Sequence, residues 1–388
     1  MKPRICIISF SNIAWDARVL REIEAAGSQY DVDVIGYGDW QPKGENIRFF
    51  SMMRSKTNVA SVLSKYIRVP LGYLLPAYWE KHFWQKQEYH RALQILLRER
   101  YDLIHANDWD SLPVAAEAVR QVGRRLLFDA HEYTPAQSAD KWMVRLFNLP
   151  VRVHLYKTYQ KWITRSITVS EGVKTLYRDN FGWSPEVIMN APHYVKSEFH
   201  PVGGDEIHLV HHGVAIRSRH LEDLVHLMGF VDSRFVLDFI LLPSEPKYLA
   251  HLKQLADKIA PAKIRFHPAV PPRNLSQELA KFDIGIPWLR ANNLNHINAL
   301  PNKFFDYVMA GLGIAILPLP SMQKIIEEHG VGVVAADLSI QKMAAALNSL
   351  TPEKINQLKT NSLELAKSLN AEVEMKKLMN IYEEMLKK

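Results

Sequence analysis

Cysteine and long apolar runs are almost absent from this sequence. Cys6 is the one cysteine among 388 residues, so no intramolecular disulfide can form, and a reducing compartment is favoured. Nowhere do about 18 apolar residues follow one another, as a membrane-spanning helix would need. The apolar run after Lys2 and Arg4 is too short for a signal peptide. We therefore expect a cytoplasmic protein, soluble or peripheral on the inner face of a membrane, with Cys6 as a buried thiol.

Acidic residues are missing from one stretch and scarce in another. Residues 141–165 contain six basic side chains and no acidic one, and residues 54–91 contain seven basic side chains against Glu80 and Glu88. Both segments are rich in aromatic rings, a combination that suits an anionic membrane surface. Helices with basic outer faces and buried rings would give the same pattern. No nucleic-acid recognition module accompanies the charge, so we expect no nucleic-acid partner.

The composition is that of an ordinary globular protein, in a chain too long for a single hydrophobic core. Short apolar runs alternate with helix-period segments, which predicts two parallel sheets covered by helices, each a doubly wound, Rossmann-like domain. We expect the first domain over 1–195 with a helical insertion at about 52–100, and the second over 196–370. A helix at about 370–388 is expected to rejoin the first domain. The expected strands are 5–10, 32–37, 103–106, 125–129, 167–169 and 187–189, then 208–211, 236–241, 264–266, 284–287, 314–317 and 331–334.

The segment 299–316 has the pattern of a short capped helix between a loop and a strand. Pro301 fits the first helical position, and Gly311 fits a left-handed C-terminal cap. The free backbone N–H groups at the start of this helix would favour a diphosphate. Lys303 would add a positive charge there, and the Asp306 carboxylate could accept hydrogen bonds from two ribose hydroxyls.

These residues resemble the PNKxFEY motif of the family 4 retaining glycosyltransferases, a form of their E-x7-E signature. The resemblance implies the GT-B fold. Asp306 stands where the family has its ribose-binding Glu, and Asn298 stands where it has the first Glu, so neither position holds the usual residue. Upstream, the turn after 208–211 resembles the family's phosphate-binding glycine turn, with Gly213 approaching the phosphate and Arg219, or Arg217, neutralising it.

By the same resemblance, other segments take roles on the donor and acceptor sides. The loop around His267 and Val270 is expected to contact the nucleobase, and Ala299 and Leu300 to line the donor site with Asn298. In the first domain, three segments resemble family motifs. They supply His131 near the donor sugar, and the acceptor-side residues Asn107, Asp108, Asn12 and Asp16. We expect the Asp108-Trp109-Asp110 triplet not to bind a metal, because it ends a strand of a doubly wound domain.

The family implies catalytic roles for His131, Arg219 and Lys303, with no metal and no cofactor beyond the nucleotide-diphosphate sugar used as substrate. The first domain would bind the acceptor, a saccharide or polyprenyl-linked saccharide, and the second the donor. Such a transfer, with retention of anomeric configuration, would belong to cell-surface polysaccharide or glycan synthesis. Two alternatives stay open: a degenerate nucleotide-sugar-binding protein without turnover, motivated by Asn298 and Asp306, and a non-hydrolysing sugar-nucleotide epimerase, which shares the fold.

Overall fold

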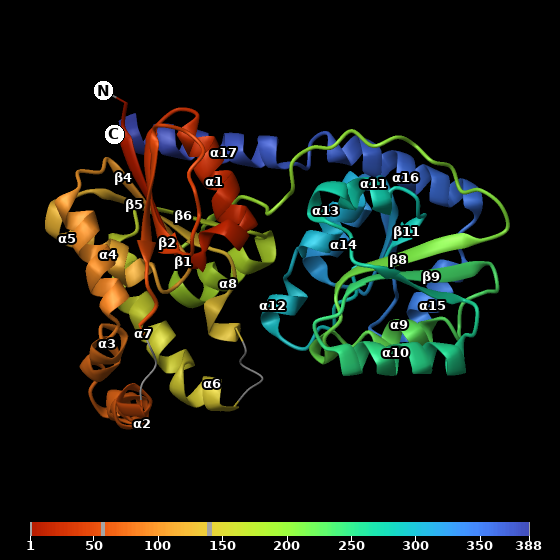
Figure 1. Cartoon of the computed structure of the whole chain (residues 1–388), viewed down its shortest axis with the longest axis horizontal. Helices are drawn as coiled ribbons and strands as arrows, with labels where there is room; N and C mark the ends of the chain where they lie inside the picture. The colour runs from red at the N-terminus through yellow and green to blue at the C-terminus, as the bar shows by residue number, and fades with distance from the viewer. Residues whose placement is uncertain (1, 56–58, 138–141, 388) are drawn as a thin grey trace. The chain divides into compact units, whose positions relative to one another are not determined.

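The computed structural model describes residues 2–55, 59–137 and 142–387, without the side chains of 59–65. Lys56 and Lys141 of the two basic segments therefore lie outside the described residues. The chain divides into two compact units, one made of residues 1–189 and 374–388 and the other of residues 190–373 (Figure 1). Both are built on a parallel sheet with helices against its faces, so the doubly wound fold class predicted from the sequence is confirmed.

The sheet of unit 1 has seven parallel strands in the order β3-β2-β1-β4-β5-β6-β7. The strands in chain order are β1 (Arg4–Asn12), β2 (Asp31–Tyr37), β3 (Ile47–Met52), β4 (Leu103–Asn107), β5 (Arg125–Ala130), β6 (Arg165–Thr168) and β7 (Glu186–Val187). The chain order reverses between β1 and β4, and in such sheets ligands bind beyond the carboxyl ends of the strands at that point. The central strands are buried on both faces and mostly apolar, as is typical of sheets covered on both sides.

Helices cover the two faces of this sheet. Its helices are α1 (Ala17–Gly27), α2 (Val59–Leu74), α3 (Ala77–Phe83), α4 (Gln87–Arg98), α5 (Leu112–Val122), α6 (Trp142–Phe147), α7 (Leu149–Tyr159), α8 (Glu171–Phe181) and α17 (Ala371–Lys387). On one face, α1 and α17 bury Val19, Ile23, Leu378 and Tyr382 in a core shared with β1 and β2. The other core takes residues from the remaining helices, most of them from α4, α5, α7 and α8. The last helix of the chain is thus part of the N-terminal unit (Figure 1).

Unit 2 has six parallel strands in the order β10-β9-β8-β11-β12-β13, with the reversal between β8 and β11. The strands are β8 (Ile207–Val214), β9 (Phe235–Leu242), β10 (Ile264–Pro268), β11 (Ile284–Gly285), β12 (Gly313–Ile316) and β13 (Gly332–Val334). Its helices are α9 (Glu222–Leu227), α10 (Pro246–Ile259), α11 (Leu275–Leu279), α12 (Leu294–Ile297), α13 (Asn302–Met309), α14 (Pro320–His329), α15 (Ile340–Asn348) and α16 (Pro352–Ala366).

Two local expectations need correction. The edge strand β3 falls just before the predicted insertion and was not expected from the sequence; it pairs with β2 from Ile47 to Met52. Helix α13 starts at Asn302, because Pro301 has an extended backbone (φ −71°, ψ 149°) and is the residue before the first turn. Gly311 does adopt the expected left-handed conformation, with φ 71°. Within the described residues, no helix is long and apolar enough to cross a bilayer.

Candidate functional site

Polar side chains gather at the carboxyl edge of the unit 1 sheet. The strand register places Ser9 of β1, Asn107 of β4 and Asp129 of β5 side by side, and His131 follows the end of β5. Asn107 and Asp129 are fully buried. Because buried polar groups must be hydrogen-bonded to be tolerated, their partners define the site.

His131 is held on both sides of its ring. Its Nε2 atom lies 3.0 Å from Oδ1 of Asn107 and 3.2 Å from Oδ2 of Asp129, and its Nδ1 atom lies 3.4 Å from Oδ2 of Asp108. Burial disfavours the charged ring, but the carboxylates of Asp108 and Asp129 outweigh burial and raise the pKa of His131 to about 10. His131 is therefore an imidazolium at neutral pH, a fixed hydrogen-bond donor and not a base.

Asp108 occupies a strained backbone position beside this ring. Its φ is 65°, rare for a residue other than glycine, and its N–H donates to the carbonyl of Asp129 at 2.9 Å. Asp110, two residues further along the chain, was not expected as a site residue from the sequence. It is a site candidate because burial and then the charge of Asp108 raise its pKa to about 7. Asp16 caps α1 by accepting from Val19 N–H at 3.2 Å. Asn12 is exposed at the end of β1.

A second layer of charge lies behind His131. Arg18, only 3% exposed, places its Nε 2.6 Å from Oδ2 of Asp129, and its second nitrogen donates to the carbonyl of Ile188 at 2.8 Å. Glu22, one turn along α1, is fully buried with Oε1 3.3 Å from Nε of Arg18. Sequence analysis gave these three charged residues no role. The sequence could have indicated their burial, because Arg18 and Glu22 are four residues apart and lie on the same face of α1 as Val19 and Ile23, which faces the core.

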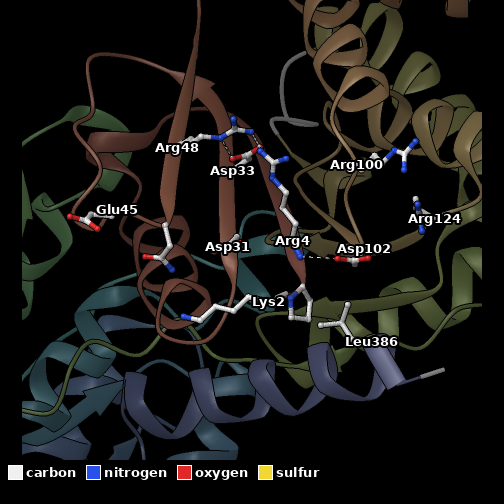
Figure 2. A pocket seen from close by; sticks show the side chains of 12 residues that line it. Lys2, Arg4, Asp31, Asp33, Glu45, Arg48, Arg100, Asp102, Arg124 and Leu386 are labelled. Carbon is white, nitrogen blue, oxygen red and sulfur yellow. Dashed lines mark hydrogen bonds and ion pairs between the residues drawn. The ribbon is translucent and has the colours of Figure 1, made fainter.

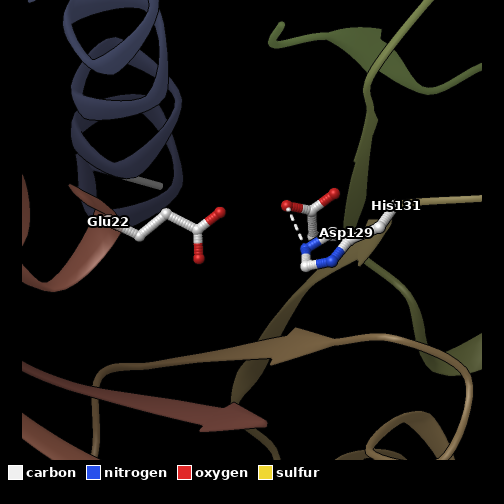
Figure 3. A group of neighbouring side chains, drawn as sticks. All are labelled: Glu22, Asp129 and His131. Atoms are coloured by element: carbon white, nitrogen blue, oxygen red, sulfur yellow. Dashed lines mark ion pairs between the residues drawn. The ribbon is translucent and has the colours of Figure 1, made fainter. Parts of the chain in front are cut away.

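Glu22, Asp129 and His131 bring possible metal-ligand atoms within 4.8 Å of one another (Figure 3). A divalent cation does not fit this group. The guanidinium of Arg18 already sits against the Asp129 carboxylate, and His131 holds a proton that a metal would have to displace. The arrangement suits a proton-bearing polar cluster.

In unit 2 the carboxyl end of β8 meets the start of α13. Gly213 has φ 128°, and a Cβ atom there would lie 2.7 Å from Nζ of Lys303, so the lysine stands directly over the glycine backbone. Burial and then the nearby charge of Arg219 lower the pKa of Lys303 to about 8, against the pull of Asp306. Two cations held together at a strand end and a helix N-terminus form an anion-binding arrangement.

Asp306 is paired with His212, a residue of β8. Nε2 of His212 lies 3.4 Å from Oδ2 of Asp306, and the two side chains are 10% and 22% exposed. The backbone N–H of His212 donates to the hydroxyl of Tyr307 at 3.2 Å, and the two rings meet edge to face. The Asp306 carboxylate is thus held by a side chain of β8.

The other predicted donor-side residues are distributed around this centre. Asn298 ends α12, and its amide donates to the carbonyl of Leu294 at 2.8 Å; the half-buried Ala299 and Leu300 follow it. Arg217 turns away, with its guanidinium over the ring of Tyr248 at 5.6 Å. The structure places the other two predicted residues, His267 and Val270, at the end of β10 and in the loop that follows it.

The His267 side chain is committed to a neighbour. Its Nε2 lies 2.6 Å from Oδ1 of Asp238, whose other oxygen meets His208 at 2.8 Å. Burial opposes the charge on Asp238, but the hydrogen bonds from the two histidines outweigh it and lower its pKa. The His267 ring is therefore part of a hydrogen-bonded cluster with Asp238 and His208, which leaves the backbone of 267–270 as the part of this loop expected to meet a base.

A pocket of about 810 Å³ lies elsewhere, at the amino-terminal edge of the unit 1 sheet (Figure 2). The charged side chains at the centre of this pocket already pair with one another. Asp33 meets Arg4 at 3.0 Å and Arg48 at 2.6 Å, and the N–H of Arg4 donates to Asp102 at 2.8 Å. Because ligands of open parallel sheets bind at the opposite edge, this pocket is not the candidate site.

Comparison with known proteins gives a consistent result. Residues 17–192 match the glycosyl transferase 4-like domain. The structure resembles sucrose-phosphate synthase of Thermosynechococcus elongatus, with a TM-score of 0.71, 14% identity and 99% of each chain covered. It also resembles HepE of Anabaena in complex with UDP and glucose, with a TM-score of 0.67, 15% identity and 98% of this chain and 100% of that chain covered.

A glycosyltransferase of Rickettsia africae is similar as well, with a TM-score of 0.69, 13% identity and 100% of this chain and 99% of that chain covered. No curated protein sequence matches the chain significantly. The likeness to these solved structures extends over both units, and it confirms the two-domain GT-B fold predicted from the sequence.

Proposed function

We propose that this protein is a family 4 glycosyltransferase that moves a sugar from a nucleotide diphosphate to a hydroxyl acceptor with retention of configuration. The match of residues 17–192 to the glycosyl transferase 4-like domain and the GT-B fold support this proposal. One observation supports this most directly. Lys303 lies over the Gly213 backbone, next to the charge of Arg219 and one helical turn from Asp306. This is the set of groups that a diphosphate and a ribose require. UDP is the first nucleotide to test, because the similar HepE structure holds UDP and glucose.

In the proposed reaction the bond between the anomeric carbon and the diphosphate oxygen breaks, and negative charge develops on that oxygen. Lys303, Arg219 and the free N–H groups at the start of α13 would stabilise this charge. The acceptor oxygen attacks the same face of the sugar, and its proton passes to the departing phosphate. This route needs no protein nucleophile and no metal, so Asn298 in place of an acid is compatible with it.

Unit 1 would bind sugar hydroxyls through the pair formed by His131 and Asp108, a charged donor beside a carboxylate acceptor. We propose a saccharide or polyprenyl-linked acceptor used in cell-surface polysaccharide or glycan synthesis. The nucleotide sugar is the substrate, and no other cofactor is proposed.

We also propose that the protein works at the inner face of a membrane, through the exposed ends of α2 and α6. The two helices are adjacent, with the Tyr66 and Phe147 rings 5.2 Å apart. Leu74 is 79% exposed and Trp142 is 69% exposed, and the exposed Arg145 follows Trp142 by about one turn of α6. Apolar, aromatic and basic side chains together are what an anionic bilayer surface favours.

The proposed function is tested by titrating the protein calorimetrically with UDP and a panel of UDP-sugars, and by assaying transfer to oligosaccharide acceptors. Arg219→Ala is expected to weaken UDP binding about tenfold or more without lowering the melting temperature, because a charge-assisted contact to phosphate is worth roughly 1.5–3 kcal/mol. Lys324→Ala, on the exposed face of α14, is the matched control.

The outcomes separate the alternatives. Binding of a nucleotide sugar without transfer or hydrolysis would favour the degenerate nucleotide-sugar-binding protein, the alternative suggested by Asn298 and Asp306. An isomerised nucleotide sugar as the product would favour the epimerase. No binding of any nucleotide, or equal loss with the α14 control, would contradict the donor site.

A further inference from the structure

Glu22 is a buried carboxyl group without a hydrogen-bond partner among the described residues. Its exposed fraction is 0%. Figure 3 shows it pointing toward Asp129 and His131. Its electrostatic neighbours are Arg18 at 3.3 Å and, on the far side, His105 at 3.9 Å.

The groups packed around Glu22 favour its anionic form less than burial and the charge of Asp129 disfavour it. His105 is buried, and burial lowers its pKa to about 3, so the ring is neutral and accepts or donates one bond with the hydroxyl of Tyr382 at 2.7 Å. Arg18 donates hydrogen bonds to Asp129 and to the carbonyl of Ile188, and it reaches Glu22 only through an ion pair at 3.3 Å. Burial and then the charge of Asp129 raise the pKa of Glu22 well above its ordinary value.

Counting the charges shows why one proton matters. Arg18 and His131 carry one positive charge each, and Asp129 and Asp108 carry one negative charge each. These four charges sum to zero when Glu22 keeps its proton, and the buried Glu374, which also acts on Arg18, is matched by Lys377 at 2.6 Å. Ionised Glu22 would add an unmatched charge in a site where burial makes such a charge expensive.

We propose that Arg18, Glu22 and Asp129 are positioning residues for His131. Arg18 fixes the one Asp129 oxygen that both Arg18 and His131 contact, at 2.6 Å and 3.2 Å. That oxygen and Asn107 hold Nε2, and Nδ1 faces the partly exposed Asp108. Glu22 completes the set as a neutral acid. The inference rests on the proposed function only for the consequence that His131 serves the transfer as a fixed cation.

The first test needs no substrate. Nitrogen-15 labelling of histidine allows the protonation of His131 to be followed by NMR from pH 5 to 9, with the signal assigned through His131→Gln. In the wild type the ring is expected to stay an imidazolium to about pH 9. Asp129→Asn is expected to let it titrate close to the ordinary value of about 6.5, whereas Glu22→Gln is expected to leave it charged because a neutral group replaces a neutral group.

A lower pKa of His131 in Glu22→Gln would mean that Glu22 is an anion and would overturn the proposal, as would an unshifted His131 in Asp129→Asn. Thermal unfolding gives an independent check that does not depend on Asp129→Asn folding. Glu22 binds its proton more tightly in the folded state, so wild-type stability falls as pH rises above about 4.5. Glu22→Gln is then expected to melt higher than the wild type at pH 8 and equally at pH 4.5, and the exposed Glu24→Gln on the same helix to show no such difference.

The last test measures the turnover number of the variants, and it follows only once UDP binding is established. If His131 in Asp129→Asn titrates with the ordinary histidine pKa of about 6.5, about 3% of the ring is charged at pH 8. Asp129→Asn is therefore expected to lose roughly 30-fold in kcat at pH 8 and to recover most of it at pH 6. A loss that does not change with pH would indicate a merely structural role. A protein that binds no nucleotide would overturn the proposed function and leave the NMR result standing.

Discussion

Lys303 is charged only below a pKa of about 8, since burial and the neighbouring Arg219 disfavour its ammonium form. A bound diphosphate would favour that form and raise its pKa. UDP affinity is therefore expected to be constant below about pH 7 and to fall by up to tenfold per pH unit above pH 8, with uptake of one proton on binding. Calorimetric titrations in buffers of different ionisation enthalpy measure both quantities. Lys303→Gln should bind more weakly with a flat pH profile; a slope as steep as that of the wild type would assign the titration to another group.

Single residues also show which parts of the candidate site could be predicted from the sequence. Gly213, Lys303 and Asp306 were expected from the family resemblance and the pattern of a capped helix, and the structure brings Lys303 against Gly213 with Asp306 one turn further along α13. The pairing of Arg18 with Asp129 could not, because 111 residues separate them and only the sheet brings them together. The same holds for His212, whose contact with Asp306 depends on the docking of α13 against β8.

At the scale of elements, α17 is fixed to unit 1 by an interior polar contact as well as by packing. Tyr382 is fully buried, its hydroxyl meets Nδ1 of His105 at 2.7 Å, and its ring meets Tyr30. Tyr382→Phe should cost about 1–3 kcal/mol for the lost hydrogen bond, and Tyr382→Ala about 3–5 kcal/mol for the added cavity. Urea unfolding measures both, and hydrogen exchange should show faster opening of α17. The exposed Asn380→Ala is the control; equal effects would contradict the anchoring role.

Most of the elements were predictable from apolar periodicity, since each expected strand overlaps an observed one. The exception, β3, is an edge strand with mixed burial, so its residues Ile47 to Met52 lack the continuous apolar run of the inner strands. Its pairing with β2 comes from tertiary context. The start of α13 was misplaced by one residue because proline suits both the first helical position and the residue before it.

For the whole molecule, the exposed apolar ends of α2 and α6 give the membrane proposal a direct test. Leu74→Glu combined with Trp142→Glu should reduce sedimentation with phosphatidylglycerol vesicles about tenfold or more, because each side chain loses roughly 1.5–3 kcal/mol of burial. The change leaves the core intact. Leu338→Glu, at a side chain that is 54% exposed in unit 2, is the control. Binding of the wild type should weaken with added salt. Equal binding by the double variant would place any membrane contact elsewhere.

The division of the chain has a further consequence for its synthesis. Unit 1 is completed only by residues 374–388, after all of unit 2 has been made. At ribosomal rates of roughly 5–20 residues per second, the face of the first sheet that α17 covers stays open for on the order of ten seconds or more. The apolar side chains of that face, including Ile5, Ile7 and Val34, are available to chaperones during this interval. Unit 2 is continuous in sequence and can complete its folding first. The N-terminal domain, although synthesised first, is therefore the last to be completed.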